Sequence, residues 1–153
     1  MIRYESTGRV GVSAVRKIQE EIGAIGRVWW QGALGFDVGE IDRPMVLSGS
    51  TKLFHGPGIP DADDVFMAWT DALFILERLS DWSKRFKIKW RIGMNDDDWG
   101  SIDPSGFSGP LLGQMKKWAR RVGAREIEKG TWVVPGERLD ELTKKYKGRP
   151  PNS

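Results

Sequence analysis

The segment Phe86-Lys87-Ile88-Lys89-Trp90-Arg91-Ile92 alternates apolar and cationic residues without a break. Because successive side chains of a β-strand point to opposite faces, this alternation predicts a strand with four apolar residues on one face and three cations on the other. Half-buried strands of this kind are typical of antiparallel sheets. The segment therefore predicts an antiparallel sheet, and its cationic face raises the question of whether the protein binds an acidic partner.

The length and composition of the chain indicate one folded domain. Of its 153 residues, 39% are hydrophobic and eight are tryptophan, which supplies enough apolar surface to offset the entropy lost on folding. We expect a single globular domain over residues 1–147 and a flexible tail over residues 148–153. The sequence contains no cysteine and no stretch with the length and apolarity of a membrane span or signal peptide, so we expect a cytoplasmic protein.

Hydrophobic periodicity predicts an α+β fold around this sheet. Helices are expected over residues 12–25, 62–85, 110–122 and 136–146. Strands of one antiparallel sheet are expected over residues 27–38, 45–54, 86–93 and 99–103. The first two strands are expected to form a hairpin, with Ser48-Gly49-Ser50 interrupting the second of them. The sheet should pack against the two main helices, those that begin at residues 62 and 110.

Local signals mark the ends of these elements. Asp61 is the expected N-cap of the helix over residues 62–85, and that helix is apolar on nearly all sides, as in helices buried on two sides. Gly123 is the expected end of the helix over residues 110–122. Lys129-Gly130 then suits a two-residue hairpin loop, which predicts a C-terminal helix, hairpin and helix.

The sequence offers little support for catalysis. The phosphate-binding motifs G-x-x-x-x-G-K-[ST] and G-x-G-x-x-G are missing, and the acidic turn after Asn95 departs from a calcium loop at Trp99 and Gly106. His55 is the only histidine, which argues against a zinc site. We expect no catalytic residue, metal or cofactor. A hydrolase that uses His55 with a carboxylate stays open as an alternative.

Two groups of cations are the candidate binding residues. The first follows the alternating segment, and the second lies on the polar side of the helix over residues 110–122, in the more basic part of the chain: residues 104–153 hold 11 Lys and Arg against five Asp and Glu. The candidate binding residues are Lys87, Lys89, Arg91, Lys116, Lys117, Arg120 and Arg121. Cations on a strand also prevent edge-to-edge aggregation, and this role alone would explain the first group. We therefore expect the first group to form a binding site only if it is continuous with the second.

These observations favour a non-catalytic protein that binds another macromolecule. The leading hypothesis is a protein-binding, inhibitor or immunity-type module whose partner has an acidic surface. The tryptophans are not part of this surface, because core packing is expected for Trp69, Trp82, Trp90 and Trp118. In size and lack of motifs the chain resembles bacterial immunity proteins and antitoxins, although its basic pI does not suit an inhibitor of basic nucleases. The alternative is nucleic-acid binding by the basic C-terminal third.

Overall fold

The computed structural model describes residues 1–25, 39–40, 46–53, 55, 58–128 and 131–146. Over these residues the chain forms one α+β domain with four helices, a six-stranded antiparallel sheet and a separate two-stranded hairpin. The predicted fold class is therefore confirmed. The predicted strand over residues 27–38 and the predicted tail over residues 148–153 lie outside the described residues.

The main sheet has the strand order β2-β3-β1-β4-β5-β6, and each neighbouring pair is antiparallel. Its strands are β1 (Ile2–Ser6), β2 (Gly39–Glu40), β3 (Leu47–Thr51), β4 (Trp90–Met94), β5 (Asp97–Asp103) and β6 (Gly106–Ser108). The N-terminal strand β1 lies inside the sheet, hydrogen-bonded to β3 on one side and to β4 on the other. The sheet is therefore assembled from distant parts of the chain.

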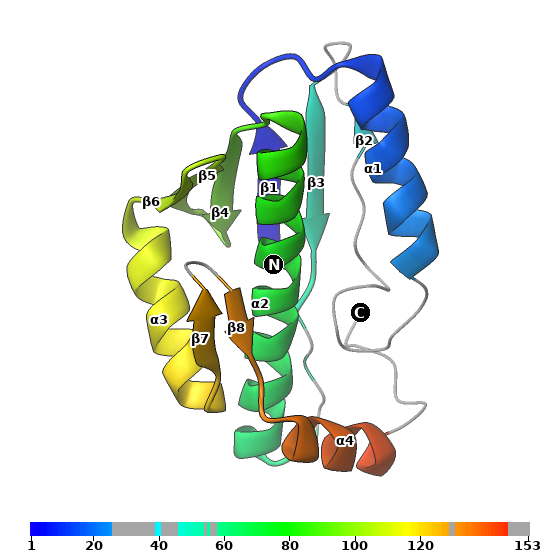
Figure 1. Cartoon of the computed structure of the whole chain (residues 1–153). Coiled ribbons are helices and arrows are strands. Elements are labelled where there is room, and N and C mark those ends of the chain that lie inside the picture. The colour runs from blue at the N-terminus through cyan, green and yellow to red at the C-terminus, as the bar shows by residue number, and fades with distance from the viewer. Residues whose placement is uncertain (26–38, 41–45, 54, 56–57, 129–130, 147–153) are drawn as a thin grey trace.

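Two helices connect these strands and lie on the same side of the sheet. The chain runs from β1 through α1 (Val12–Ile25), β2 and β3, and then through α2 (Asp61–Phe86) into β4. Figure 1 shows α1 and α2 in front of the strands, with α2 crossing the centre of the sheet. This element order with the strand order β2-β3-β1-β4 is that of the split β-α-β, or ferredoxin-like, arrangement. A fold of this type does not by itself indicate a function.

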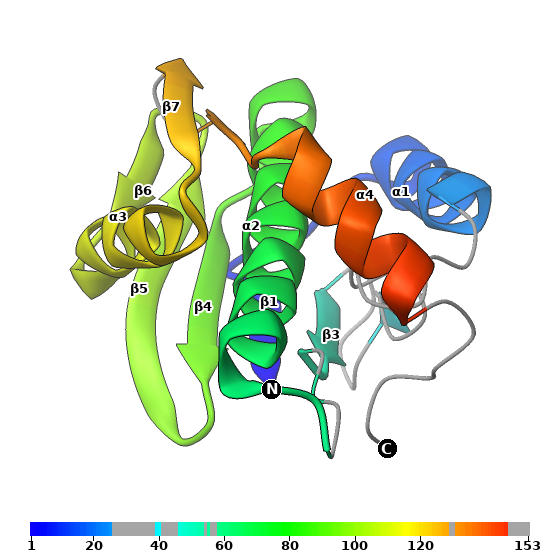
Figure 2. The same cartoon turned by 90° about the horizontal axis from the view of Figure 1, so that it is seen from below.

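The C-terminal third forms the predicted helix, hairpin and helix. Its elements are α3 (Pro110–Val122), β7 (Arg125–Glu128), β8 (Thr131–Val133) and α4 (Gly136–Lys145). The helix α3 contacts α2, β5 and β6, and therefore lies on the helix-covered side of the sheet. Figure 2 shows α4 crossing near the first turns of α2, where Arg138 donates to the Ala62 carbonyl and Tyr146 donates to Asp63.

The two-residue period of the central strands produces the core. Ile2 and Tyr4 on β1 and Trp90 and Ile92 on β4 are at most 2% exposed, and all four point toward the helices. Tyr4 packs edge-on against Trp90 with ring centroids 6.5 Å apart, and its hydroxyl hydrogen-bonds Thr51 Oγ1 at 2.8 Å. The polar end of this buried aromatic side chain is therefore satisfied.

Stacked tryptophans join α3 to the core. Trp118 of α3 lies between Trp69 of α2 and Trp99 of β5, at ring-centroid distances of 4.8 Å and 5.2 Å. Trp82, Trp90 and Trp118 are at most 3% exposed, and Trp69 is half-buried. This burial confirms the expected core role of the four tryptophans. Large aromatic side chains contribute strongly to the stability of a core.

The prediction of a strand over the whole of residues 86–93 is wrong in its first half. The helix α2 continues through Phe86, and Lys87 then ends it in the left-handed conformation, with φ 58° and ψ 44°. The backbone N–H groups of Lys87 and Ile88 both donate to the Ser83 carbonyl, which closes the last turn. The alternation of exposed and buried side chains does continue to Ile92, although only Trp90 onward belongs to β4.

Other boundaries also differ from the prediction. Ser48-Gly49-Ser50 does not interrupt a strand but forms the middle of β3, paired with β1. Asp61 is not the N-cap of α2, because Pro60 holds that position and Asp61 is the first helical residue. In contrast, the bounds of α1 and α3 and the Gly123 cap were predicted correctly.

One half-buried carboxylate, that of Glu77, anchors the C-terminal hairpin to α2. Glu77 accepts a hydrogen bond from the backbone N–H of Trp132 at 3.0 Å, and burial raises the pKa of the Glu77 carboxyl. The Trp132 side chain packs against Phe107 and is 6% exposed. The partly buried Glu77 side chain therefore fixes β8 on the core.

Replacing Glu77 should separate its role as an acceptor from its charge. Glu77→Leu leaves the Trp132 N–H without its acceptor, and we expect it to lower the free energy of unfolding by about 1–3 kcal/mol. Glu77→Gln keeps an acceptor oxygen, so it should cost clearly less. Urea unfolding followed by tryptophan fluorescence measures both variants. Equal losses in the two variants would show that the hydrogen bond does not anchor the hairpin.

The pH dependence of stability should have opposite signs at Glu77 and Glu21. Hydrogen bonds from Arg85 lower the pKa of Glu21, so its contribution is present above the ordinary pKa and is lost as the pH falls through the lowered value. The pKa of Glu77 is raised, so the folded state binds more protons and stability falls as the pH rises from 4.5 through the raised value.

We therefore expect the stability difference between wild type and Glu77→Gln to shift against the wild type as the pH rises through that window. The difference between wild type and Glu21→Gln should shift toward the wild type as the pH rises from the lowered pKa of Glu21 to 4.5. Unfolding curves at half-unit steps from pH 3 to pH 7 measure both. If both stability differences changed with pH in the same direction, the opposite pKa shifts of Glu77 and Glu21 would be contradicted.

Candidate functional site

The side of the main sheet opposite the helices carries charged and small side chains. We call this surface, formed by Arg3, Glu5, Ser48, Ser50, Arg91 and Ser101, the open face. These residues alternate along their strands with the buried ones, so the pattern that builds the core also places them outward. Among the described elements, no helix covers the open face (Figures 1 and 2).

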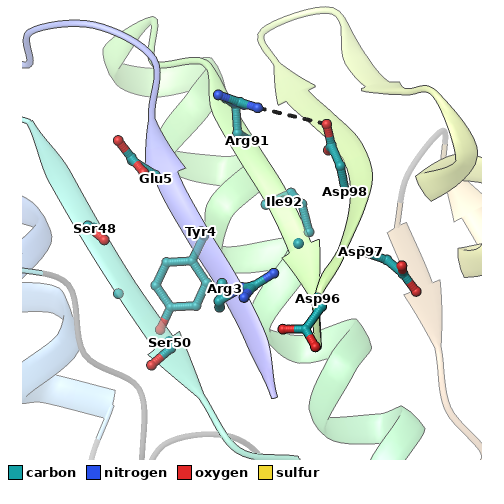
Figure 3. Close-up of a pocket in the computed structure, with 12 residues that line it drawn as sticks. Arg3, Tyr4, Glu5, Ser48, Ser50, Arg91, Ile92, Asp96, Asp97 and Asp98 are labelled. Atoms are coloured by element: carbon teal, nitrogen blue, oxygen red, sulfur yellow. Dashed lines mark ion pairs between the residues drawn. The ribbon is translucent and has the colours of Figure 1, made fainter.

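A shallow hollow of about 590 Å³ lies on the open face. Small residues account for its depth, because Ser48, Gly49 and Ser50 of β3 and Gly93 of β4 leave room that larger side chains would fill. Figure 3 shows charged side chains around this floor, contributed by β1, β4, β5 and the turn between β4 and β5. These charged residues are Arg3, Glu5, Arg91, Asp96, Asp97 and Asp98. The hollow is large enough for a peptide segment or a small ligand.

The charges alternate in sign across the strands. Glu5 of β1 lies directly opposite Arg91 of β4, and Arg91 Nη2 is 3.8 Å from Asp98 Oδ2 on β5 (Figure 3). The side chains of Arg91 and Asp98 are 68% and 69% exposed, and ion pairs so exposed to water contribute little to stability. The arrangement therefore leaves these charges accessible to a partner.

Arg3 occupies the centre of the hollow because Gly93 has no side chain. A Cβ atom at Gly93 would lie 3.0 Å from Arg3 Nη2 and 3.2 Å from the Asp97 carbonyl oxygen. The guanidinium thus lies across the β4 backbone, and in Figure 3 it extends toward the β4–β5 turn that carries Asp96. A guanidinium held in this way presents several N–H donors to the hollow.

The acidic turn between β4 and β5 forms one end of the hollow. Met94 pairs with Asp97, so Asn95 and Asp96 make a two-residue turn, with Asn95 at φ 54°. Asp98 accepts a hydrogen bond from the backbone N–H of Gly100 at 3.1 Å. The turn was predicted from its composition. Among the described residues, no group of three or more His, Asp or Glu side chains is placed to hold a metal ion.

The structure does not join the two groups of candidate cations into one continuous surface. Arg91 lies on the open face, Lys89 is exposed just before β4, and Lys87 is the exposed residue that ends α2. The predicted basic surface of the helix over residues 110–122 is present, with Lys116, Lys117, Arg120 and Arg121 all exposed on α3. However, α3 packs on the helix side of the sheet, so its cations are not continuous with Arg91.

His55 has a carboxylate partner in the structure. Its Nδ1 lies 3.0 Å from Asp64 Oδ2, in the first turns of α2. The His55 side chain is 59% exposed, and no serine or threonine hydroxyl is among its hydrogen-bond partners in the described part of the chain. A hydrolase would need a nucleophile at the other ring nitrogen, so the pair alone provides an orienting contact and not a catalytic set.

Arg3 and Glu5 were missed as site residues in the sequence. Their signal was present, since Ile2-Arg3-Tyr4-Glu5-Ser6 alternates in the same way as the segment before Met94. The alternation covers only five residues at the N-terminus, where a short strand is easily overlooked. Their meeting with Arg91 depends on β1 pairing with β4, which joins residues about ninety positions apart.

Comparison with known proteins adds no relative, because no family model, no curated protein and no solved structure matches this chain. None of the described helices combines the length and the apolar character that a membrane crossing requires. The function must therefore be argued from the geometry and charge of the surfaces described above.

Substituting Gly93 should displace Arg3 from the hollow. Gly93→Ala places a methyl group against Arg3 and the Asp97 carbonyl, and overpacking of this kind costs about 1 kcal/mol or more of stability. Because the methyl group already displaces Arg3, Arg3→Ala should cost less in the Gly93→Ala protein than in the wild type. Urea unfolding of the four proteins measures this coupling. Strictly additive losses would show that Arg3 is not seated on Gly93.

Proposed function

We propose that this protein is a non-catalytic binding module that recognises another protein through the open face. The observation that carries the proposal is the hollow of about 590 Å³, whose floor is made of small residues and whose rim carries arginines and carboxylates. Arginine is enriched at protein interfaces, and exposed charges of both signs set the orientation and the rate of association. The open face thus has the chemistry of a recognition surface.

The rim of the hollow favours a partner that is mainly basic. Two arginines, Arg3 and Arg91, stand among four carboxylates, so the hollow carries net negative charge. A partner segment with lysine or arginine residues and one acidic group would complement both signs. The sequence favoured an acidic partner, because that expectation rested on the two groups of cations and did not include Glu5, which lies opposite Arg91. An inhibitor or immunity-type role is compatible with this charge. The cytoplasmic location expected from the sequence stays a prediction.

The basic surface of α3 supports nucleic-acid binding as a second candidate function. Lys116, Lys117, Arg120 and Arg121 are all exposed, and none forms an ion pair with a residue that the structure describes. Such a set suits sequence-independent contacts with phosphates. The carboxylates of the open face would repel nucleic acid, so the two functions would use different sides of the molecule.

Site-directed photo-crosslinking distinguishes the two surfaces. We expect a photoreactive amino acid at Ser50, on the open face, to crosslink a protein partner in cells that express this protein, whereas the same amino acid at Lys117 should not. The charge reversal Glu5→Arg with Asp96→Arg should reduce the Ser50 crosslink at least about tenfold, since it makes the hollow repel a mainly basic partner and charge pairs at an interface contribute several kcal/mol.

The charge reversal Asp140→Arg with Glu141→Arg is the matched control, because it changes the net charge by the same amount at exposed positions of α4. It should leave the Ser50 crosslink unchanged. Crosslinks to nucleic acid from Lys117, with no protein captured from Ser50, would overturn the proposal in favour of the second candidate.

A further inference from the structure

A second cavity lies at the end of the sheet where β1 leads into α1. Its volume is about 190 Å³, and its two walls are the β1–α1 loop, residues 6–11, and the connection from α2 to β4, residues 86–89. We call it the loop pocket. It is separate from the hollow of the open face, since the two share no lining residue.

The charged residues of the loop pocket are all cationic. Arg9 belongs to the first wall and Lys87 and Lys89 to the second, and the lining contains no Asp or Glu. None of the three cations forms an ion pair with a described residue. Their mutual repulsion would be relieved by a bound anion.

Asp103 is an acidic neighbour of Lys89, and its carboxylate already accepts hydrogen bonds from Ser105. Lys89 helps to lower the pKa of the Asp103 carboxyl, but the larger cause is hydrogen bonding from Ser105. Asp103 Oδ1 accepts from the Ser105 backbone N–H at 2.7 Å and from its hydroxyl at 2.5 Å. Lys89 therefore has an acidic neighbour whose hydrogen-bonding capacity is partly used.

Hydrogen bonds hold both walls of the loop pocket in place. The backbone N–H of Thr7 donates to the Lys89 carbonyl at 3.0 Å and joins one wall to the other. Ser6 Oγ accepts from the Leu47 backbone N–H at 2.9 Å and donates to the Gly8 carbonyl. The second wall is fixed by the Ser83 hydroxyl, which donates to the Ile88 carbonyl. The cations thus project from a backbone that is ordered without a ligand.

Lys87 is the most informative of the three cations. It adopts the left-handed conformation, with φ 58°, at a helix end where glycine is the residue usually found. A lysine there accepts backbone strain, and strain of this kind is concentrated at functional sites. The first turn of α1 follows Gly11, which lines the pocket, and the positive end of this helix dipole adds positive potential there.

We propose that the loop pocket binds a single phosphate group, with Arg9, Lys87 and Lys89 as its ligands. The volume decides the size of the anion, because about 190 Å³ accommodates one phosphate with some water and is smaller than the cavities that hold whole nucleotides. The phosphate is either the free ion or the terminal group of a small phosphate monoester. This proposal does not depend on the protein-binding function of the open face.

Thermal unfolding and calorimetric titration with inorganic phosphate test the proposal, with sodium chloride keeping the ionic strength constant. The double variant Lys87→Gly with Lys89→Gln removes two ligands. Glycine suits the left-handed position, so this variant should fold at least as well as the wild type. We expect it to bind phosphate at least about tenfold more weakly, since each charge-assisted hydrogen bond contributes on that scale.

Lys116→Gln with Lys117→Gln is the matched control, with the same loss of charge on α3, and it should bind phosphate as the wild type does. Phenyl phosphate serves as the monoester probe: tighter binding than inorganic phosphate would identify a monoester as the ligand, and weaker binding would identify the free ion. The absence of a phosphate-dependent shift in the wild type, or equal affinity in both double variants, would overturn the proposal.

Discussion

The contact between α2 and the central strands β1 and β4 is the constraint on which the rest of the structure depends. Ile2, Tyr4, Trp90 and Ile92 are all nearly inaccessible to water beneath the helices. Each of these strands has a period of two, so burying one set of side chains forces the alternate set outward. Arg3, Glu5 and Arg91 are therefore on the open face because their neighbours are in the core, and a shift of one residue would exchange the two sets.

This coupling gives the charged residues of the open face a defined geometry at little energetic cost. The register that aligns Glu5 with Arg91 is fixed by buried neighbours, and the exposed pair between Arg91 and Asp98 adds little to it. Charges positioned by a rigid sheet lose less entropy on binding than charges on loops. The recognition proposed for the open face therefore relies on the geometry of the strands and not on the strength of the exposed ion pair between Arg91 and Asp98.

The sequence predicted the parts of the fold that depend on local periodicity and failed where distant contacts decide. The bounds of α1 and α3 follow from apolar spacing and from end signals such as Gly123, which act within a few residues. The end of α2 did not follow from the pattern, because the alternation after Phe86 is the same whether a helical turn or a strand carries Lys87. Only the closure of the last turn onto Ser83 decides between them.

The candidate site was predicted less well than the fold, for a related reason. Arg91 was identified from its strand, but its chemical character comes from Glu5 and Asp98, which reach it through pairing with β1 and β5. Pairings between distant segments depend on the whole sheet, whereas a strand pattern is local. The sequence could therefore name the cation and the acidic turn near it, but it could not show that Glu5 lies opposite Arg91.

Lys87 shows how a departure from local preference can indicate function. A non-glycine residue in the left-handed region costs about 1 kcal/mol, and glycine at that position would end α2 equally well. The Lys87 side chain is exposed and forms no ion pair with a described residue, so the described contacts in the fold do not offset this cost. A lysine in that position is explained if its ammonium group has a ligand, and the loop pocket, lined by two further cations, is where that ligand would bind.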